Sequence, residues 1–192
     1  MFMYRKSAEK QCGFTLVELL VVIGLTALLA SIAIPSYQTM TVSNRVSRVA
    51  SEFHGNLLLA RSEALKRGTT VTICKSANPG DGIAVCDNSP STAGTNVGWG
   101  SGWLMFVDGN ANCVIDAGED LIRAQNSLLA SSREGAVVPS NGIQCISFGS
   151  TGQTFTAVNF EISAPSGFAT SERAVCVAIG GRARVGKMPN CS

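Results

Sequence analysis

The sequence has a single histidine and lacks the common catalytic signatures. His54 has no cysteine or carboxylate at metal-ligand spacing, and nothing around it forms a plausible catalytic triad. No Gly-x-Ser-x-Gly segment occurs, and the glycine-rich stretch at 98–103 precedes a strand-like run instead of the helix that a phosphate-binding loop requires. We therefore expect a protein that is not an enzyme and needs no cofactor, with His54 as a packing residue on a helix.

Net charge is also scarce. The formal charge at pH 7 is +2, and it comes from the first thirteen residues, where Arg5, Lys6 and Lys10 outweigh Glu9. The remaining twelve basic and twelve acidic side chains balance each other. Bulk electrostatics therefore does not predict nucleic-acid binding, and any such binding must come from a local patch.

The seven cysteines include no Cys-x-x-Cys pair, so the sequence predicts no zinc site or other metal site. Cys12 stands alone near the N-terminus, whereas the other six lie in the part rich in glycine, serine and threonine. An even set of this kind predicts a disulfide framework in an oxidising compartment such as the periplasm or cell surface. The pairing stays a guess, because six cysteines allow many connectivities. We favour Cys74 with Cys86, Cys113 with Cys145, and Cys176 with Cys191.

Residues 14–34 form an apolar run that contains one charged side chain, Glu18. As a helix this run is about 30 Å long, which matches the hydrocarbon core of a bilayer. Basic residues precede it and none follows until Arg45, so the N-terminus is expected in the cytoplasm and the rest of the chain in the periplasm or beyond. An ordinary secretory signal would be cleaved after its apolar run, which favours an uncleaved anchor. A carboxylate in such a span marks a function or a partner.

The segment "GFTLVELLVVIGLTALLASIAIPSY" resembles the N-terminal signature of type IV pilins and type II secretion pseudopilins. The resemblance implies that residues 1–13 are a leader, which a prepilin peptidase removes by cutting between Gly13 and Phe14 before methylating Phe14. It also implies that residues 14–35 form a helix of the membrane and later of the filament core. There Glu18 of one subunit would meet the positively charged amine of a neighbour's Phe14, and the pair would neutralise two groups that are costly alone.

Beyond Pro35 the helical period continues through residues 36–68, with charged side chains off the apolar stripe. The helix is therefore expected to become amphipathic and to need a partner surface. Gly68 is suited to end it, and Lys66 and Arg67 suit the negative end of the helix dipole. The stripe consists of Val42, Val46, Val49, Phe53, Leu57, Ala60 and Ala64.

From residue 69 to residue 192 the pattern changes to short runs rich in valine, isoleucine, threonine and phenylalanine, separated by turn residues. The expected class is α+β, with one long helix packed on an antiparallel sheet domain. This is also the pilin fold that the resemblance implies. The expected strands are 69–75, 102–108, 119–125, 143–148, 154–162 and 174–181.

Residues 108–119 carry acidic and amide side chains at EF-hand-like spacing, so a calcium loop is one reading. Against it, Cys113 occupies the sixth position, where the sharp turn favours glycine, and the flanks look like strands. A turn between two strands, which binds no metal, is rich in the same residue types and explains the same sequence pattern. The segment is similar to a β-hairpin of the GspH, FimT and FimU group of minor pilins and pseudopilins, and we favour that reading. The side chains in question are Asp108, Asn110, Asn112, Asp116 and Glu119.

The C-terminal part is basic, because no acidic side chain follows Glu172. Arg182 and Arg184 are two residues apart, which in an extended chain places both guanidinium groups on one face, within reach of adjacent phosphates. The stretch Gly181-Arg182-Ala183-Arg184 resembles the Gly-Arg-x-Arg motif with which FimT-like minor pilins contact DNA. The resemblance implies a site for double-stranded DNA at Gly181, Arg182 and Arg184, and the positive charge of the nearby Lys187 adds this residue to the candidate site.

Together these features predict a minor pilin or pseudopilin in the inner membrane, assembled with other pilins at or near the tip of a type IV pilus or type II secretion filament. The alternative is a DNA-binding minor pilin that captures extracellular DNA for natural transformation. The sequence leaves open which of the two machines recruits the subunit.

Overall fold

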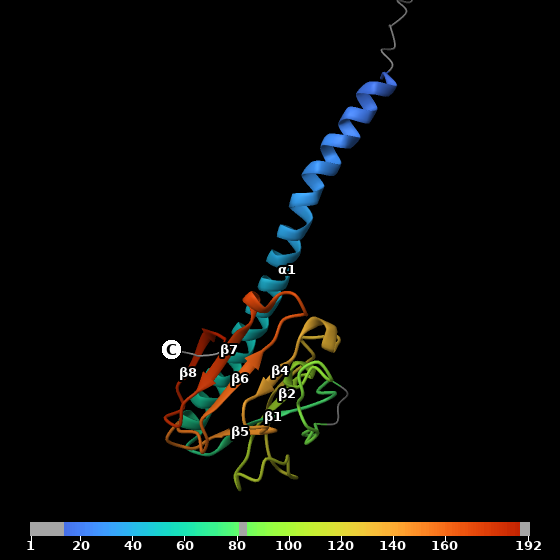
Figure 1. Cartoon of the computed structure of the whole chain (residues 1–192). Helices are drawn as coiled ribbons and strands as arrows, with labels where there is room; N and C mark the ends of the chain where they lie inside the picture. The colour runs from blue at the N-terminus through green and yellow to red at the C-terminus, as the bar shows by residue number, and fades with distance from the viewer. Residues whose placement is uncertain (1–13, 81–83, 189–192) are drawn as a thin grey trace, which may run out of the picture. The chain divides into compact units, whose positions relative to one another are not determined.

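The computed structural model describes residues 14–80 and 84–188. The helix α1, Leu16–Arg67, takes up the first part of the described chain (Figure 1). The chain divides into two compact units, and the boundary between them lies within this helix, between Gln38 and Thr39. The helix continues through Pro35, although proline lacks the amide hydrogen that would bond to the preceding turn.

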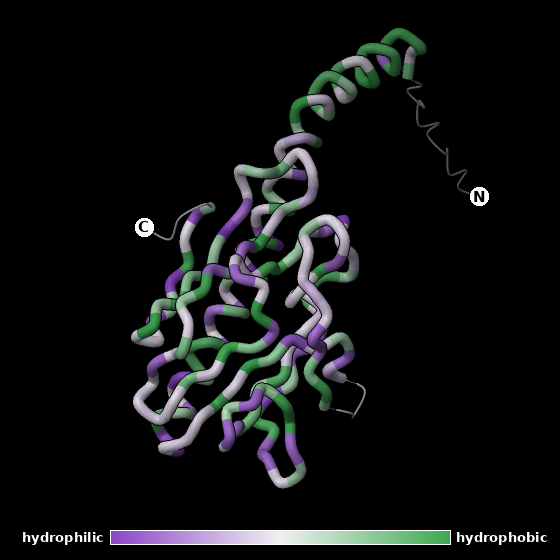
Figure 2. The backbone as a smooth tube through the Cα atoms, turned by 60° about the horizontal axis from the view of Figure 1, so that its bottom comes forward, coloured by the Kyte–Doolittle hydropathy of each residue, from purple (hydrophilic) through white to green (hydrophobic). Residues whose placement is uncertain are grey.

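In the first unit, α1 is apolar on all sides. Its side chains from Leu16 to Gln38 are exposed apart from the half-buried Ala30, and Figure 2 shows these turns coloured mostly as hydrophobic. Its hydropathy and length are sufficient to cross a membrane. A helix that is hydrophobic all round and not covered by its own chain needs an apolar environment supplied from elsewhere.

In the second unit, the remainder of α1 buries one face. Every residue of the predicted stripe is buried except Val42, which is half-buried, so the predicted amphipathic face is confirmed. Gly68 ends the helix with φ +66°, and its N–H donates to the carbonyl of Ala64 at 2.9 Å, as the sequence predicts. In the last turn, Arg67 donates to Glu63 at 2.8 Å, and this bond holds the pKa of the Glu63 carboxyl below its ordinary value.

The described residues form eight strands in two antiparallel sheets. The predicted α+β class with one long helix on antiparallel strands is confirmed, although the expected single sheet is two four-stranded sheets. The first has the order β3-β2-β1-β5 and the second the order β4-β6-β7-β8. The first sheet contains β1 Val71–Lys75, β2 Trp103–Val107, β3 Leu121–Gln125 and β5 Cys145–Phe148. The second contains β4 Val137–Pro139, β6 Val158–Ile162, β7 Arg173–Val177 and β8 Ala183–Lys187.

Aromatic side chains join the helix to both sheets. Phe53 of α1 packs edge-on against Trp103 of β2 at 5.0 Å and against Phe160 of β6 at 4.6 Å, measured between ring centroids. Trp99 lies 5.7 Å from Phe53 and completes the cluster. All four rings are fully buried. Edge-on aromatic pairs add to area burial, so this cluster fixes how the sheets sit against the helix.

Candidate functional site

The carboxylate of Glu18 is bonded to the start of its own helix. The backbone N–H and the hydroxyl of Thr15 both donate to Glu18 Oε2 at 3.2 Å, and the Glu18 N–H donates to Thr15 Oγ1 at 3.2 Å. This reciprocal pair is a capping box, which satisfies two donors that a helix start otherwise leaves open. This role of Glu18 was not predicted from the sequence, although Thr-x-x-Glu before an apolar run is its signal. The box leaves Glu18 exposed, so its carboxylate is oriented and still accessible.

The residues around the expected processing point are only partly described. Phe14 is 83% exposed and lies immediately before Thr15 and the start of α1. Gly13, the residue on the other side of the expected cut, lies outside the described residues, as does the rest of the expected leader.

Two of the three favoured disulfide pairings are present. The structure joins Cys74 to Cys86 and Cys113 to Cys145. Cys176 is also disulfide-bonded, and its favoured partner, Cys191, lies outside the described residues.

The loop after β1 is held by a bridge and a buried ion pair. Lys75, whose side chain is 3% exposed, lies 3.1 Å from Asp87 Oδ2 and donates to the hydroxyl of Ser89 at 2.9 Å. Burial alone would raise the pKa of the Asp87 carboxyl, but hydrogen bonds from Ser89 and Lys75 outweigh it and hold this pKa below its ordinary value. Together with the Cys74–Cys86 disulfide, the ion pair fixes the segment from Cys86 to Ser89 beside β1.

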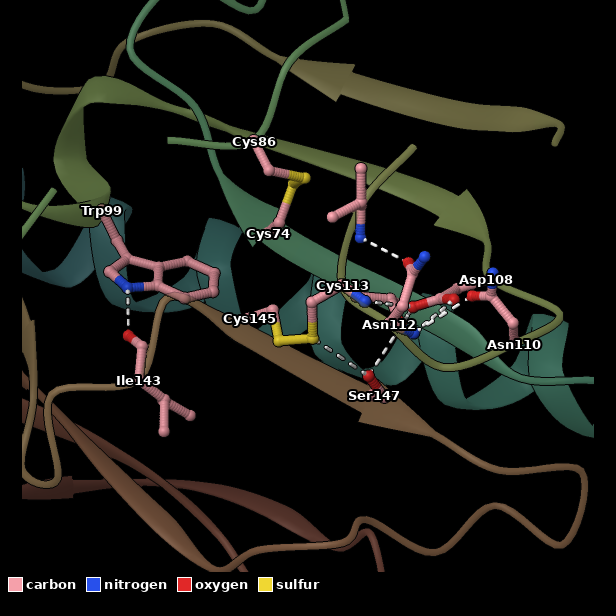
Figure 3. The surroundings of a disulfide bond; sticks show 12 residues. Cys74, Cys86, Trp99, Asp108, Asn110, Asn112, Cys113, Ile143, Cys145 and Ser147 are labelled. Atoms are coloured by element: carbon pink, nitrogen blue, oxygen red, sulfur yellow. Dashed lines mark hydrogen bonds between the residues drawn. A yellow bond between two sulfur atoms is a disulfide. The ribbon is translucent and has the colours of Figure 1, made fainter. Parts of the chain in front are cut away.

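The loop that follows β2 is organised around one buried carboxylate, as Figure 3 shows. Asp108 is fully buried, and its oxygens accept hydrogen bonds from the Thr72 hydroxyl at 2.7 Å and from the backbone N–H groups of Asn112 and Cys113 at 3.1 and 3.0 Å. Cys113, at the sixth position of the loop, adopts φ +64°. The sharp turn therefore forms here without a glycine. Asp108 thereby presents Cys113 to Cys145 of β5.

Other hydrogen bonds in this loop determine where its carboxylates point, which matters for the calcium hypothesis. Asp116 Oδ2 accepts from the side-chain amides of Asn110 and Asn112, each at 2.9 Å. Glu119 accepts from the N–H groups of Gly109 and Asp116. The carboxylates are thus turned toward the loop's own donors, and over 14–80 and 84–188 no group of three or more candidate ligands converges on one point. The geometry is that of a hydrogen-bonded hairpin loop.

Two of the expected DNA-contacting side chains lie together on β8 and the turn before it. Arg182 and Arg184 are both exposed, and they line a hollow of about 370 Å³ together with Asn159 and Cys176. Lys187 belongs to the opposite face of β8, because side chains alternate along a strand. The structure therefore brings together Arg182 and Arg184 and does not bring Lys187 to them.

Gly181 has a different role from the one expected. It is buried at φ +72°, and a Cβ placed on it would lie 1.8 Å from the carbonyl oxygen of Gly152. Its missing side chain therefore serves the close approach of two loops. Arg61 of α1 donates to that same Gly152 carbonyl at 3.0 Å. The structure thus gives Gly181 a packing role, and its contact with DNA stays a prediction.

His54 is a packing residue with one specific contact. It is half-buried on α1, and its Nε2 lies 3.3 Å from the carbonyl oxygen of Ala183, to which its N–H donates. Ala183 stands between Arg182 and Arg184. His54 thus holds the start of β8 from the helix side, and Arg61 holds the Gly152 loop against which Gly181 packs. Ala183 is buried toward the helix side, so the exposed arginines on either side of it face away from α1.

The chain is similar in sequence to two protein families and to several fimbrial proteins. Residues 49–181 match the family of the type II transport protein GspH, and residues 9–34 match the prokaryotic N-terminal methylation motif. A "Probable minor fimbrial protein" of Dichelobacter nodosus is 35% identical over 120 residues, which cover 62% of this chain. The chain spans 65% of that relative's length. The type IV major fimbrial protein FimA of the same organism is 30% identical over 138 residues, which cover 68% of this chain and 86% of FimA.

Among solved structures, the type IV minor pilin FimU of Pseudomonas aeruginosa resembles this chain with a TM-score of 0.53 at 18% identity. The match covers 74% of this chain and 89% of FimU. At this identity the likeness concerns the fold, and it agrees with the expected arrangement of one helix on antiparallel strands.

Proposed function

The chain belongs to the family of the type II transport protein GspH, and from this premise we propose that it is a minor pilin or pseudopilin acting at or near the tip of a type IV pilus or type II secretion filament. The role is structural and not catalytic. The proposed route begins in the inner membrane with a cytoplasmic N-terminus, and a prepilin peptidase then cuts between Gly13 and Phe14. Other pilins are the partners in the filament.

One observation carries this proposal: an oriented carboxylate stands on an otherwise apolar, uncovered helix. The side chains around Glu18 are exposed and apolar, so they suit lipid first and packed helices afterwards. Once Phe14 becomes the N-terminus, its amine carries a positive charge next to the capping box. Glu18 can then accept from the amine of a neighbouring subunit, which sets the register between the two helices.

Variants at Glu18 test whether its charge is needed for assembly. Glu18→Gln keeps an oxygen that can accept the Thr15 hydrogen bonds but removes the charge, whereas Glu18→Ala removes both. We expect both variants to insert normally into the membrane and to reduce incorporation into filaments at least about tenfold, the effect of losing roughly 1.4 kcal/mol or more. The measurement is quantitative immunoblotting of sheared filaments against the membrane fraction.

Thr26→Val is the matched control, because Thr26 is a polar residue of the same segment whose hydroxyl bonds only to its own helix, at the carbonyls of Val22 and Ile23. It should incorporate like the unchanged protein. Normal incorporation of Glu18→Gln would reduce the role of Glu18 to capping and remove the support for an intersubunit charge pair.

A second candidate function is the capture of extracellular double-stranded DNA for natural transformation. It is favoured by the exposed pair Arg182 and Arg184, which line one hollow and flank Ala183, the residue that His54 of α1 contacts. No acidic side chain lines their hollow among the described residues. Two guanidinium groups so placed suit neighbouring phosphates and carry no base specificity.

The double variant Arg182→Ala/Arg184→Ala is expected to weaken DNA binding about tenfold and to reduce the salt slope of the binding constant by about two. Electrophoretic mobility shift of the full chain in detergent, from low to moderate salt, gives both quantities. Lys187→Ala is the matched control, since it removes a positive charge from the other face of the same strand. Equal binding by the double variant and the unchanged protein would exclude this pair as the DNA site.

A further inference from the structure

Phe155 is an exposed aromatic side chain on firmly held backbone. Its side chain is 70% exposed, whereas the preceding Thr154 is 3% exposed. The Thr154 N–H donates to the carbonyl of Ile179 at 2.9 Å, and its hydroxyl donates to that of Ala178 at 3.1 Å. Thr154 also bridges to Phe148 at the end of β5. The hydrogen bonds of Thr154 therefore hold the Phe155 ring at a defined place on the surface.

Beside Phe155 lies a hollow of about 350 Å³ with mostly apolar walls. Phe155, Ile143 and Ile146 line it together with the Cys113–Cys145 disulfide. The disulfide fixes the hairpin loop to β5 and keeps this wall in place. A space of this size admits a planar ring system, and a rigid wall lowers the entropy lost on binding.

The apolar hollow adjoins the basic one. Thr156 lines the first and Ala157 lines the second, so consecutive residues of one short segment contribute to both hollows. Thr154 ties that segment to the turn between β7 and β8, which leads into Arg182. Among the described residues, the linings of both hollows contain no acidic side chain.

This arrangement combines phosphate-binding groups with an exposed aromatic ring, which is the pattern by which proteins hold single-stranded nucleic acid. A base within a duplex is stacked on both faces and paired along one edge, so it cannot enter the hollow, whereas an unpaired base can stack on Phe155. We propose that the hollow lined by Phe155, Ile143 and the Cys113–Cys145 disulfide takes an unpaired nucleobase of a DNA strand whose phosphates contact Arg182 and Arg184. This inference rests on the DNA-binding function proposed above.

The test compares single-stranded and duplex DNA on the full chain in detergent. The probes are a fluorescently labelled strand of about twenty thymidines and a duplex of the same length, and the measurement is fluorescence anisotropy at low salt. Phe155→Ala should weaken binding of the single strand about tenfold, in line with the loss of one stacked base, and should leave duplex binding within about twofold. Leu121→Ala is the matched control, because Leu121 is an exposed apolar residue of β3 that lines neither hollow.

The outcomes separate this inference from the proposal on which it rests. If Phe155→Ala binds the single strand as the unchanged protein does while Arg182→Ala/Arg184→Ala is weakened, the base site is excluded and DNA binding stands. If the unchanged protein binds neither probe better than the double arginine variant, both proposals fail. If Phe155→Ala reduces filament incorporation and leaves DNA binding intact, the hollow is a contact between subunits and the base site is overturned.

Discussion

Replacing Asp108 by alanine is expected to lower the free energy of unfolding of the globular part by about 4 kcal/mol. The side chain is fully buried and accepts from three donors, the Thr72 hydroxyl and the N–H groups of Asn112 and Cys113. Alanine removes the acceptor of all three bonds, and a hydrogen bond to a charged group contributes about 1.5–3 kcal/mol. The loss is partly offset, because the Thr72 hydroxyl keeps Ser147 as a partner and the Asn112 N–H keeps Asn110. Urea denaturation of the full chain in detergent measures this loss through the fluorescence of the buried Trp99 and Trp103.

Asp116→Ala provides the control within the same loop. Asp116 is exposed and accepts mainly from the side-chain amides of Asn110 and Asn112. Its removal should lower the free energy of unfolding by less than about 1 kcal/mol. Similar losses for the two variants would show that the loop is held by its carboxylates as a group and that Asp108 has no central role.

Gly181→Ala is expected to lower the free energy of unfolding by about 3 kcal/mol. Alanine at φ +72° is strained, at a cost of about 1–3 kcal/mol, and its Cβ meets the backbone oxygen of Gly152, which is already engaged by Arg61. The loops must separate to admit the methyl group. The same denaturation measurement applies, and weakened DNA binding should accompany the change because Arg182 follows directly.

Gly180→Ala is a matched control one residue away. A Cβ on Gly180 meets no atom within 4 Å, and its φ lies outside the left-handed range. It should therefore unfold within about 0.5 kcal/mol of the unchanged protein. If Gly181→Ala were as well tolerated, the requirement for glycine in this motif would lie in ligand contact after all.

The helical half of the fold could be predicted because its determinants are local. The stripe from Val46 to Ala64 repeats with the helical period, and Gly68 marks the end that the structure has. The division of the strands into two sheets could not be predicted, because strand pairing joins residues far apart in the sequence. Strand β4 was missed for a related reason: it has three residues, ends in Pro139 and exists only through its pairing with β6.

For the candidate site, residue types were predictable and contacts were not. The spacing of Arg182 and Arg184 correctly placed them on one face of an extended segment. The same alternation of side chains along a strand places Lys187 on the other face. Lys187 was nevertheless grouped with Arg182 and Arg184 in the sequence-based prediction because of its positive charge. The burial of Gly181 depends on Gly152, a distant residue with no local signal of this contact. The capping box of Thr15 and Glu18 had a local signal that was overlooked.

The short connection between α1 and β1 affects how a pulling force on the helix reaches the β domain. Only Gly68, Thr69 and Thr70 separate the two elements, so tension transmitted to the end of the helix enters β1 directly. This strand is central in its sheet, paired with β2 on one side and β5 on the other. Such a strand is loaded in shear across two ladders at once, whereas an edge strand can be peeled away one hydrogen bond at a time. Tension along α1 that reaches β1 is therefore opposed by two ladders of hydrogen bonds, one with β2 and one with β5.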